Sequence, residues 1–367
     1  MRITDVSVQL VQSDDGRKWT HVLIDTDEGI RGIGEATYSH KELVVAEMVR
    51  ALRDRVIGRD PFDTELLYLD LYAHGRAGYR TGGVMFTSAI SGIDQACWDI
   101  KGKALGAPVS ALLGGPREAR VPVYAHFGGD TIEARIEDAQ RRMAEGFTAI
   151  KSGTTEWIAP GPRVDRHELR RIDEAYAALR SALGDDVELM DDPHAAYDAA
   201  AGLAVARVLE PYHLLFLEEP TIPEDLAGYA RIRNGTTTTI AGSERLTSKF
   251  RFDELFKAGG VDVAQPDPVY IGGITELKKV AAIAELYQVV IAPHNTKGPV
   301  GIMAAAHVMA SIPNALIQEF IAPSWIPWRD SVLQDPMDLQ DGRLLVRDRP
   351  GLGVVFDQDA LRPHLLA

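Results

Sequence analysis

The first third of the chain changes its hydrophobic pattern once. Between residues 2 and 37 apolar and polar residues alternate through VSVQLV and HVLID, and a turn at residues 27–29 leads into IRGIGEA. This period of two predicts an antiparallel meander. Apolar residues then recur every three or four positions, which predicts three helices, over residues 41–57, 62–74 and 84–105. Residues 1–115 are therefore expected to form an α+β domain.

From about residue 120, short apolar runs alternate with amphipathic helical segments. The eight runs are VPVYAHF, FTAIKS, VELMDD, LLFLEE, TIAGSE, VAQPD, VVIAPH and ALIQEF. Eight strands that alternate with helices close a parallel barrel of the TIM type. We predict such a barrel over residues 116–338. We expect the turn-rich segment 339–367 to pack back on the first domain.

The composition and net charge of the chain indicate which classes of protein it can belong to. The 367-residue chain is 46% hydrophobic and 25% charged, which is typical of a soluble globular protein, and no apolar run approaches membrane-spanning length. A net charge of -14 argues against nucleic acid and anionic membranes as partners. Cys97 lies in an apolar helical pattern and is expected to be buried. Because the chain starts like a strand and has no paired cysteines, we expect a cytoplasmic protein.

Ionisable residues end the apolar runs at a regular interval. In a β/α barrel the active site forms at the carboxyl ends of the strands, so these residues are expected to converge. From the third run onward they are 23 to 27 residues apart. The series consists of Lys151, Asp192, Glu218, Glu244, Asp267, His294 and Glu319.

Three consecutive strands are expected to end in Asp192, Glu218 and Glu244. Three carboxylates around one point repel one another unless a cation neutralises them. Mg²⁺ suits a site made of a few carboxylates, waters and substrate oxygens. A single strand-end acid is readily solvated or caps a helix, but three at similar spacing favour a metal site. Asp191 falls out of step and is expected to have a structural role.

The next two strands are expected to end in Asp267 and His294. An aspartate beside a histidine fixes its tautomer and raises its basicity, which is typical of a general base. His126 and His307 are expected to be satisfied core residues. Glu319 ends the last strand, where it could hold a proton and donate a hydrogen bond to a developing oxyanion.

Several motifs resemble one family when they are taken as a set. In the barrel they are EEP at 218–220, GSER at 242–245, QPD at 265–267, GGIT at 272–275 and APH at 292–294. With SAISGIDQACWDIKGKALGAPV in the first domain and PGLGV near the end, they resemble the enolase superfamily, in particular its mandelate racemase-like branch. The resemblance covers nearly the whole chain. It implies a modified TIM barrel, (β/α)7β, with an α+β capping domain.

The resemblance also implies a shared chemistry. Mg²⁺ would be held by Asp192, Glu218 and Glu244, and the proton α to a carboxylate would be removed to give an enediolate. His294 paired with Asp267 would be the base, and Glu319 would stabilise the enediolate. An even-numbered homo-oligomer is a further implication.

Racemases of this branch use the second lysine of a K-x-K motif as a second base. Here that motif reads Lys151-Ser152-Gly153, so the second lysine is absent and two-base racemisation is disfavoured. Lys151 itself is expected to touch the substrate carboxylate. The alternative is a strand-end lysine that extends toward solvent.

The Asp-x-His motif at Asp192 to His194 resembles the sugar-acid dehydratases, closest to the galactonate dehydratase type. There the histidine is the general acid that protonates a departing hydroxyl; a loop-capping role is the alternative for His194. The residues that follow, Ala195-Ala196, depart from the pattern and leave the substrate open.

Three further residues are expected to contact the substrate. Trp19 and Arg80 would do so when the first domain closes over the barrel. The segment Asn295-Thr296-Lys297 also departs from the family pattern, and Lys297 would meet a distal carboxylate if the substrate is a diacid. The alternative is that Lys297 is a solvated loop lysine with no role in binding.

The sequence therefore predicts a Mg²⁺-dependent hydro-lyase that converts an aldonic or aldaric sugar acid into a 2-keto-3-deoxy acid. Two alternatives remain. One is a cycloisomerase or epimerase that uses the same enediolate with a different outcome. The other is a sugar-acid sensor without catalytic activity.

Overall fold

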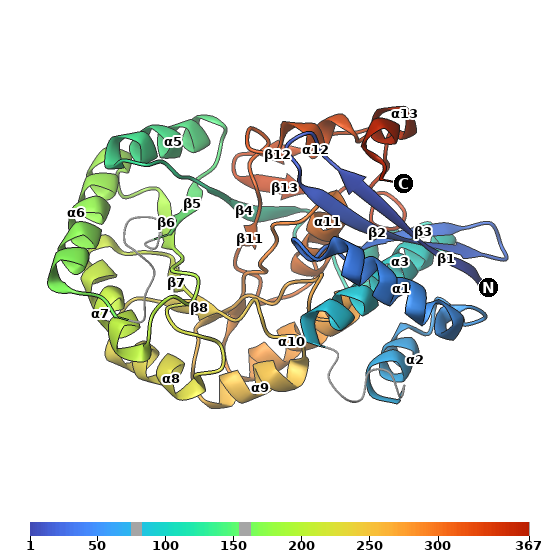
Figure 1. The fold of residues 1–367 in the computed structure, drawn as a ribbon, viewed down its shortest axis with the longest axis horizontal. Helices are drawn as coiled ribbons and strands as arrows, with labels where there is room; N and C mark the ends of the chain where they lie inside the picture. The colour runs from blue at the N-terminus through green and yellow to red at the C-terminus, as the bar shows by residue number, and fades with distance from the viewer. Residues whose placement is uncertain (75–82, 154–162, 367) are drawn as a thin grey trace.

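The computed structural model describes residues 1–74, 83–153 and 163–366, and it contains both predicted regions (Figure 1). An antiparallel sheet with its helices forms one side of the molecule. Strands of a parallel α/β region form the other side, with helices along their outer face. Within the described ranges no helix is both long and apolar enough to cross a membrane.

The N-terminal region follows the predicted order of strands and then helices. Its sheet has the order β1-β2-β3, with both pairs antiparallel. The strands are β1 Ile3–Gln12, β2 Lys18–Thr26 and β3 Arg31–Glu35. The helices are α1 Glu42–Val56, α2 Thr64–Leu69 with a π-helical continuation at Asp70–His74, α3 Gly83–Leu105 and α4 Val109–Leu112. Cys97 on α3 is buried, as predicted.

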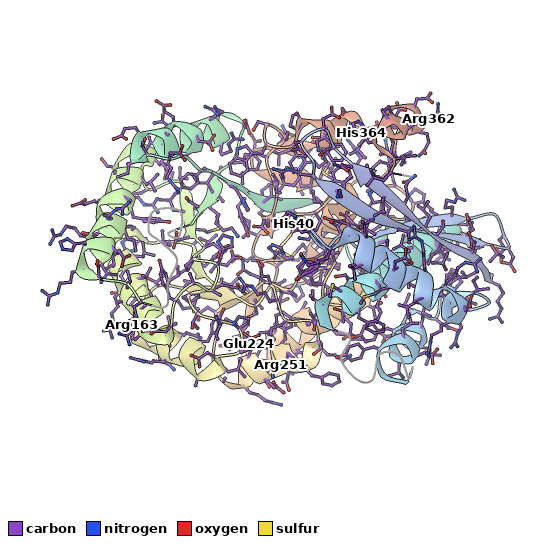
Figure 2. The ribbon with its side chains drawn as sticks, viewed as in Figure 1. His40, Arg163, Glu224, Arg251, Arg362 and His364 are labelled. Carbon is purple, nitrogen blue, oxygen red and sulfur yellow. The ribbon has the colours of Figure 1, made fainter. Side chains whose placement is uncertain are left out.

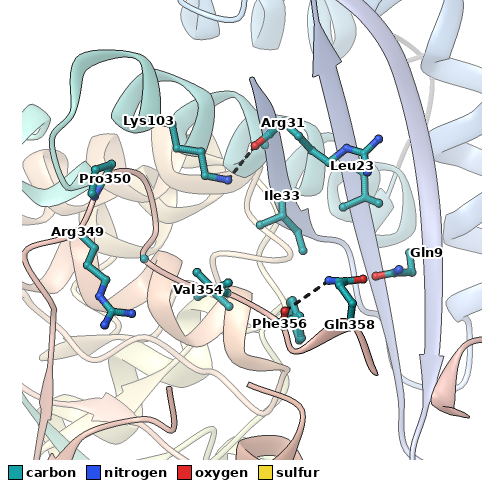
Figure 3. A pocket seen from close by; sticks show the side chains of 13 residues that line it. Gln9, Leu23, Arg31, Ile33, Lys103, Arg349, Pro350, Val354, Phe356 and Gln358 are labelled. Carbon is teal, nitrogen blue, oxygen red and sulfur yellow. Dashed lines mark hydrogen bonds between the residues drawn. The ribbon is translucent and has the colours of Figure 1, made fainter. Parts of the chain in front are cut away.

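Helix α3 lies against the free edge of β3 because two strand positions lack side chains. A Cβ atom at Gly32 would lie 2.2 Å from the carbonyl oxygen of Ala96, and one at Gly34 would lie 1.9 Å from that of Gly92. The close approach lets three α3 side chains, spaced four residues apart, bond the β3 backbone. These bonds join Gln95 to the N–H of Glu35 (3.0 Å), Asp99 to the N–H of Ile33 (3.0 Å) and Lys103 to the carbonyl of Arg31 (2.8 Å; Figure 3).

The spacing of these three bonds follows from helix and strand geometry. Four helical residues rise about 6 Å and two strand residues about 6.6 Å, so the two repeats stay in register over three contacts. The outer edge of β3 is therefore bonded to side chains of the same chain.

The parallel region contains all eight predicted strands. They are β4 Arg120–His126, β5 Ala149–Ser152, β6 Glu188–Asp191, β7 Phe216–Glu218, β8 Ile240–Gly242, β9 Val263–Ala264, β10 Val290–Ile291 and β11 Gln318–Glu319. Neighbours from β4 to β10 pair in chain order, and β11 pairs with β4. The ladder is not continuous between β10 and β11, so the barrel is not closed there. An isolated bridge, Ile291 with Ala315, joins β10 to the segment just before β11.

Helices follow most of these strands and cover the outer face of the sheet (Figure 1). They are α5 Ile132–Ala144, α6 Arg166–Leu183, α7 Ala199–Leu209, α8 Leu226–Gly235, α9 Lys249–Lys257, α10 Gly273–Leu286 and α11 Pro299–Met309. Apolar residues of strands and helices form one large core, and the inner face of the strands forms a smaller one around Tyr124 and Phe216.

The last part of the chain contacts both regions. Its elements are α12 Pro327–Ser331, β12 Leu339–Gln340, β13 Arg343–Leu345 and α13 Gln358–Leu361. Strand β13 pairs antiparallel with β4. Near the C-terminus, the N–H of Leu366 donates to the carbonyl of Leu10 in β1 (2.9 Å).

His307 on α11 is a satisfied core residue, as predicted. Its Nδ1 accepts a hydrogen bond from the N–H of Ser110 (3.1 Å), and its Nε2 bonds the carbonyl of Leu352 (3.2 Å). Burial lowers the pKa of His307 to about 4, although the bond to Leu352 opposes the shift. Burial likewise lowers the pKa of His21 in β2 to about 3. Both imidazoles are therefore neutral in the folded protein at neutral pH.

We expect the protein to lose stability as the pH falls below about 6.5. His21 and His307 titrate near 6.5 in the unfolded chain, so below this pH the unfolded state binds more protons. The full stability is present above pH 6.5 and declines toward pH 4, by about 1.4 kcal/mol per pH unit for each histidine. Urea unfolding between pH 8 and 5 should show a shallower decline for His307→Gln than for the wild type. The exposed His167→Gln is the control, and equal slopes in all three proteins would contradict the prediction.

Candidate active site

A cavity of about 110 Å³ lies at the carboxyl ends of the parallel strands. Six of the predicted site residues line it: Lys151, Asp192, His194, Glu244, His294 and Glu319. Two more lie directly behind this lining, since Glu218 bonds Lys151 and Asp267 bonds His294. The interval between strand ends thus brings eight predicted residues to one place.

Lys151 on β5 lies in the middle of the acidic residues. Its Nζ is 2.6 Å from Glu218 Oε2, 2.8 Å from Glu319 Oε1 and 3.4 Å from Asp192 Oδ2. Burial alone disfavours the charged form, but Glu218 and Glu319 outweigh it and raise the pKa of Lys151 well above its usual value. Lys151 is therefore a buried ammonium ion and does not extend toward solvent.

His294 has Asp267 at one ring nitrogen and the carboxylates of Glu244 and Glu319 at the other. Its Nδ1 bonds Asp267 Oδ2 at 2.7 Å, and its Nε2 lies 3.2 Å from Glu244 Oε2 and 3.6 Å from Glu319 Oε2. Burial opposes protonation, yet Glu244, Glu319 and the bond to Asp267 together raise the pKa of His294 to about 9. Asp267 fixes the ring so that Nε2 faces the cavity.

Glu319 at the end of β11 is fully buried and bonded at both oxygens. Oε1 accepts a hydrogen bond from His126 Nε2 (2.6 Å) and forms an ion pair with Lys151 Nζ (2.8 Å), and Oε2 accepts a hydrogen bond from the N–H of Asn295 (2.7 Å). Burial raises the pKa, but Lys151 and His294 outweigh it and hold the pKa of Glu319 well below its usual range. Glu319 is a carboxylate in this state, so a proton-donor role requires a change of charge at a neighbour.

His126 is a site residue that the sequence analysis missed. It ends β4, lines the cavity, and its side chain is 24% exposed. The prediction that it is a satisfied core residue is wrong. A signal was available, because His126 ends the first apolar run and so occupies the strand-end position of that unit.

His194 reaches the cavity through a turn. Strand β6 ends at Asp191, whose Oδ1 accepts a hydrogen bond from Tyr176 of α6 (2.6 Å). The N–H of His194 donates to Asp192 Oδ1 (2.8 Å), and its Nε2 lies 3.3 Å from Asp192 Oδ2. The side chain is 62% exposed. His194 therefore lies at the open side of the cavity, whereas His294 is buried.

A pair formed by a buried glutamate and a half-exposed arginine lies beside this turn and was also missed. Glu219 follows Glu218, Arg245 follows Glu244, and Arg245 Nη2 lies 3.1 Å from Glu219 Oε2. Burial and the carboxylate of Glu244 raise the pKa of Glu219 well above its usual value, against the effect of Arg245. The pattern gave no signal because both residues are out of step with the strand-end series.

Glu35 at the end of β3 connects the N-terminal region to the loop after His294. It is fully buried, and its carboxylate accepts hydrogen bonds from the N–H groups of Gly298 (2.7 Å) and Gly301 (2.8 Å) at the start of α11. A Cβ atom on Gly298 would lie 2.9 Å from this carboxylate. The glycine therefore makes room for the contact.

Two of the residues predicted to contact the substrate, Trp19 and Lys297, do not line the cavity. Trp19 is buried, stacks on Trp328 at 4.0 Å, and lines a separate cavity of about 240 Å³. Lys297 is buried, with Nζ 2.8 Å from Thr296 Oγ1 and 3.8 Å from Asp267 Oδ2, so it is not a solvated loop lysine. Arg80 lies outside the described residues.

The acidic residues have the chemistry that a hard cation requires. Glu218 Oε1 is buried and has no hydrogen-bond partner, which is costly for a carboxylate oxygen. Burial and the Asp192 carboxylate raise the pKa of Glu218 to about 8, against the effect of Lys151. As they stand, outside residues 75–82, 154–162 and 367, no three His, Cys, Asp or Glu side chains are arranged to hold a metal ion. The donor set fits a divalent cation, and Lys151 supplies the positive charge here.

A second, larger cavity lies away from these residues. Its volume is about 420 Å³, and β1 to β3, α3 and residues 349–358 line it (Figure 3). Each of its three cationic residues is paired: Arg31 with Asp25, Lys103 with Asp99 and Arg349 with Asp335. None of the predicted catalytic residues lines it. The smaller cavity is therefore the candidate active site despite its size.

Acid and base side chains at the carboxyl ends of parallel strands, next to an α+β domain, define an enzyme of the α/β-barrel class. Residues 134–360 match the family described as Enolase C-terminal domain-like. Residues 6–114 match the N-terminal domain of the mandelate racemase/muconate lactonizing enzymes. The chain belongs to this family of the enolase superfamily.

Individual relatives support the same placement. The chain is 37% identical to a D-galactonate dehydratase of Xanthomonas oryzae pv. oryzae over 94% of its own length and 90% of that protein. It is 40% identical to a D-galactonate dehydratase of Ralstonia pickettii, over 82% and 78%. The solved 3,6-anhydro-D-galactonate cycloisomerase of Zobellia galactanivorans is 33% identical, with a TM-score of 0.88 and full coverage of both chains.

Proposed function

We propose that the protein is a Mg²⁺-dependent hydro-lyase that dehydrates a sugar acid to a 2-keto-3-deoxy acid. The observation that carries the proposal is a pair of histidines on one cavity, each held by an aspartate: His294 by Asp267 and His194 by Asp192. Dehydration of a 2,3-diol acid needs a base for the C2 proton and an acid for the 3-hydroxyl. Relatives named D-galactonate dehydratase support the substrate class.

The buried histidine is suited to the base role. Nε2 of His294 faces the cavity, while Asp267 holds Nδ1 and stabilises the imidazolium that forms when the proton arrives. Lys151 lies among the carboxylates, where its ammonium group is placed to bind the substrate carboxylate and the charge that develops on it.

Asp192, Glu218 and Glu244 are the residues that would hold the cation. When bound, Mg²⁺ supplies positive charge that acidifies the C–H bond next to the substrate carboxylate. A cation held there would engage the charge of Glu244, which is the strongest of the carboxylate charges that favour protonated His294. Neutral His294 would be the form that accepts the proton.

The exposed histidine is suited to the acid role. His194 lies at the open side of the cavity, where a departing hydroxyl can leave as water. Incubation with a panel of aldonic and aldaric acids and Mg²⁺, followed by an assay for 2-keto-3-deoxy products, tests the function. If no acid gave a 2-keto-3-deoxy product in the presence of Mg²⁺, the result would count against the proposed function.

We expect His194→Asn to separate the two halves of the reaction. Proton removal depends on His294, so exchange of the C2 proton in D₂O should stay within a few-fold of the wild type. Loss of water should slow by about 10² to 10⁴-fold, the usual contribution of a general acid. NMR of substrate and product measures both rates in one sample. Equal losses in both rates would show that His194 does not act at the leaving hydroxyl.

A cycloisomerase is the second candidate, because the solved cycloisomerase of Zobellia galactanivorans has the same fold over the full chain. Such an enzyme shares the proton-removal step and differs in the fate of the intermediate. Incorporation of solvent deuterium without loss of water would favour this candidate over the dehydratase.

A further inference from the structure

We infer that Arg245 and Glu219 are positioning residues that hold His194 in place for the loss of water. This inference rests on the proposed function, since it concerns the proton donor of that reaction. It begins from the backbone. Three residues that are not glycine adopt left-handed conformations where two neighbouring strands end: His194 (φ 51°), Ala195 (φ 58°) and Glu219 (φ 38°).

Such conformations are rare for residues with a Cβ atom, and two in succession after β6 require outside support. Part of the support is local, because the N–H of His194 donates to Asp192 Oδ1 (2.8 Å). The rest comes from the next strand: the N–H of Ala195 donates to the carbonyl of Glu219 (2.9 Å). The two left-handed turns therefore hold each other.

Arg245 joins both turns from the strand beyond. Its Nη2 donates to the carbonyl of His194 (3.1 Å) and lies 3.1 Å from Glu219 Oε2. The Glu219 side chain is 2% exposed and that of Arg245 is 46% exposed, so Arg245 reaches a buried carboxyl group from the solvent side. One terminal nitrogen of the guanidinium makes both contacts, so a lysine at this position could keep one of them and lose the other.

Arg245 contacts the turn that holds the proton donor and does not contact the base. It bonds the backbone of His194, whereas His294 is held by Asp267 on a different strand end. Loss of Arg245 should therefore misplace the proton donor and leave the base in position. The expected signature is a change in the ratio of water loss to proton exchange.

The experiment compares Arg245→Gln and Arg245→Lys with the wild type in D₂O, on whichever sugar acid the wild type dehydrates. Product formation should fall tenfold or more in Arg245→Gln, with C2 exchange within about twofold of the wild type. Arg245→Lys should fall between them. Arg251→Gln, on the outer surface of α9 (Figure 2), removes an arginine that pairs with Glu254 and should change neither rate.

Equal falls in exchange and dehydration, or no change in either, would overturn the inference. A Mg²⁺ titration followed by thermal unfolding accompanies the kinetics, because Arg245 adjoins Glu244 and a weakened metal site would lower both rates together. If the wild type acts on no acid, the proposed function fails. The positioning role is then tested through the chemical reactivity of His194. Its rate of carbethoxylation, measured by mass spectrometry, should then rise severalfold in Arg245→Gln, and an unchanged rate would contradict the inference.

Discussion

Replacing His294 with asparagine is expected to stop both proton exchange and dehydration. Nε2 of His294 is the nitrogen that faces the cavity with Asp267 behind the ring, and asparagine cannot accept the proton. Loss of a general base lowers rates by about 10² to 10⁴-fold. Exchange of the C2 proton and formation of the 2-keto-3-deoxy product are followed together in D₂O with saturating Mg²⁺.

The exposed His167→Gln is the matched control, and its rates should equal those of the wild type. Circular dichroism must show that His294→Asn remains folded. A variant that retains exchange while losing dehydration would assign the base role to another residue. His126 would be the next candidate, because it lines the same cavity and bonds Glu319.

Glu35→Ala is expected to give the largest loss of stability. It leaves the buried N–H groups of Gly298 and Gly301 without acceptors, and each unsatisfied group costs about 1 to 3 kcal/mol. We therefore expect a loss of about 2 to 6 kcal/mol in the free energy of unfolding. Activity should fall as well, because Gly298 follows His294 by only four residues.

Glu35→Gln keeps one acceptor oxygen and should recover part of the loss. The surface variant Glu47→Ala on α1, which loses only a pair with Arg50, should unfold like the wild type. Urea unfolding and kcat are measured on the same preparations. If Glu35→Ala matched Glu47→Ala in both, Glu35 would have no role in holding the start of α11.

The strand-end residues could be predicted from the sequence because the geometry of a β/α barrel determines where they lie. Once eight strands run parallel, the residues that end them share one face, and a regular interval identifies them. This is why Asp192, Glu218 and Glu244 could be placed near His294 without coordinates. The same logic applied to the first strand would have found His126, but no interval leads into the first strand.

The surroundings of Lys297 and Trp19 could not be predicted because long-range contacts decide where these side chains lie. Lys297 follows His294 in a segment that looks exposed, yet it lies over the ring of Tyr270 and beside Asp267. Trp19 belongs to β2 and stacks on Trp328, which is more than 300 residues away in the chain. Neither contact leaves a periodic pattern.

The turn at His194 shows a different limit. A strand that continued past Asp191 would have brought His194 to the correct side by alternation alone. The chain instead leaves β6 in a left-handed turn whose partners, Glu219 and Arg245, come from the next two strand ends. His194 does lie near Asp192, as predicted, but a left-handed turn brings it there and not the alternation of a continued strand.

The bonds from α3 to β3 also affect how copies of this chain can meet. An open strand edge is a template for another strand, and it leads to aggregation when the edge is long and flat. On β3 the outward N–H groups of Ile33 and Glu35 already donate to Asp99 and Gln95, so these two donors are not available to a second chain. A strand from another copy that paired with β3 at these positions would first have to displace the α3 side chains.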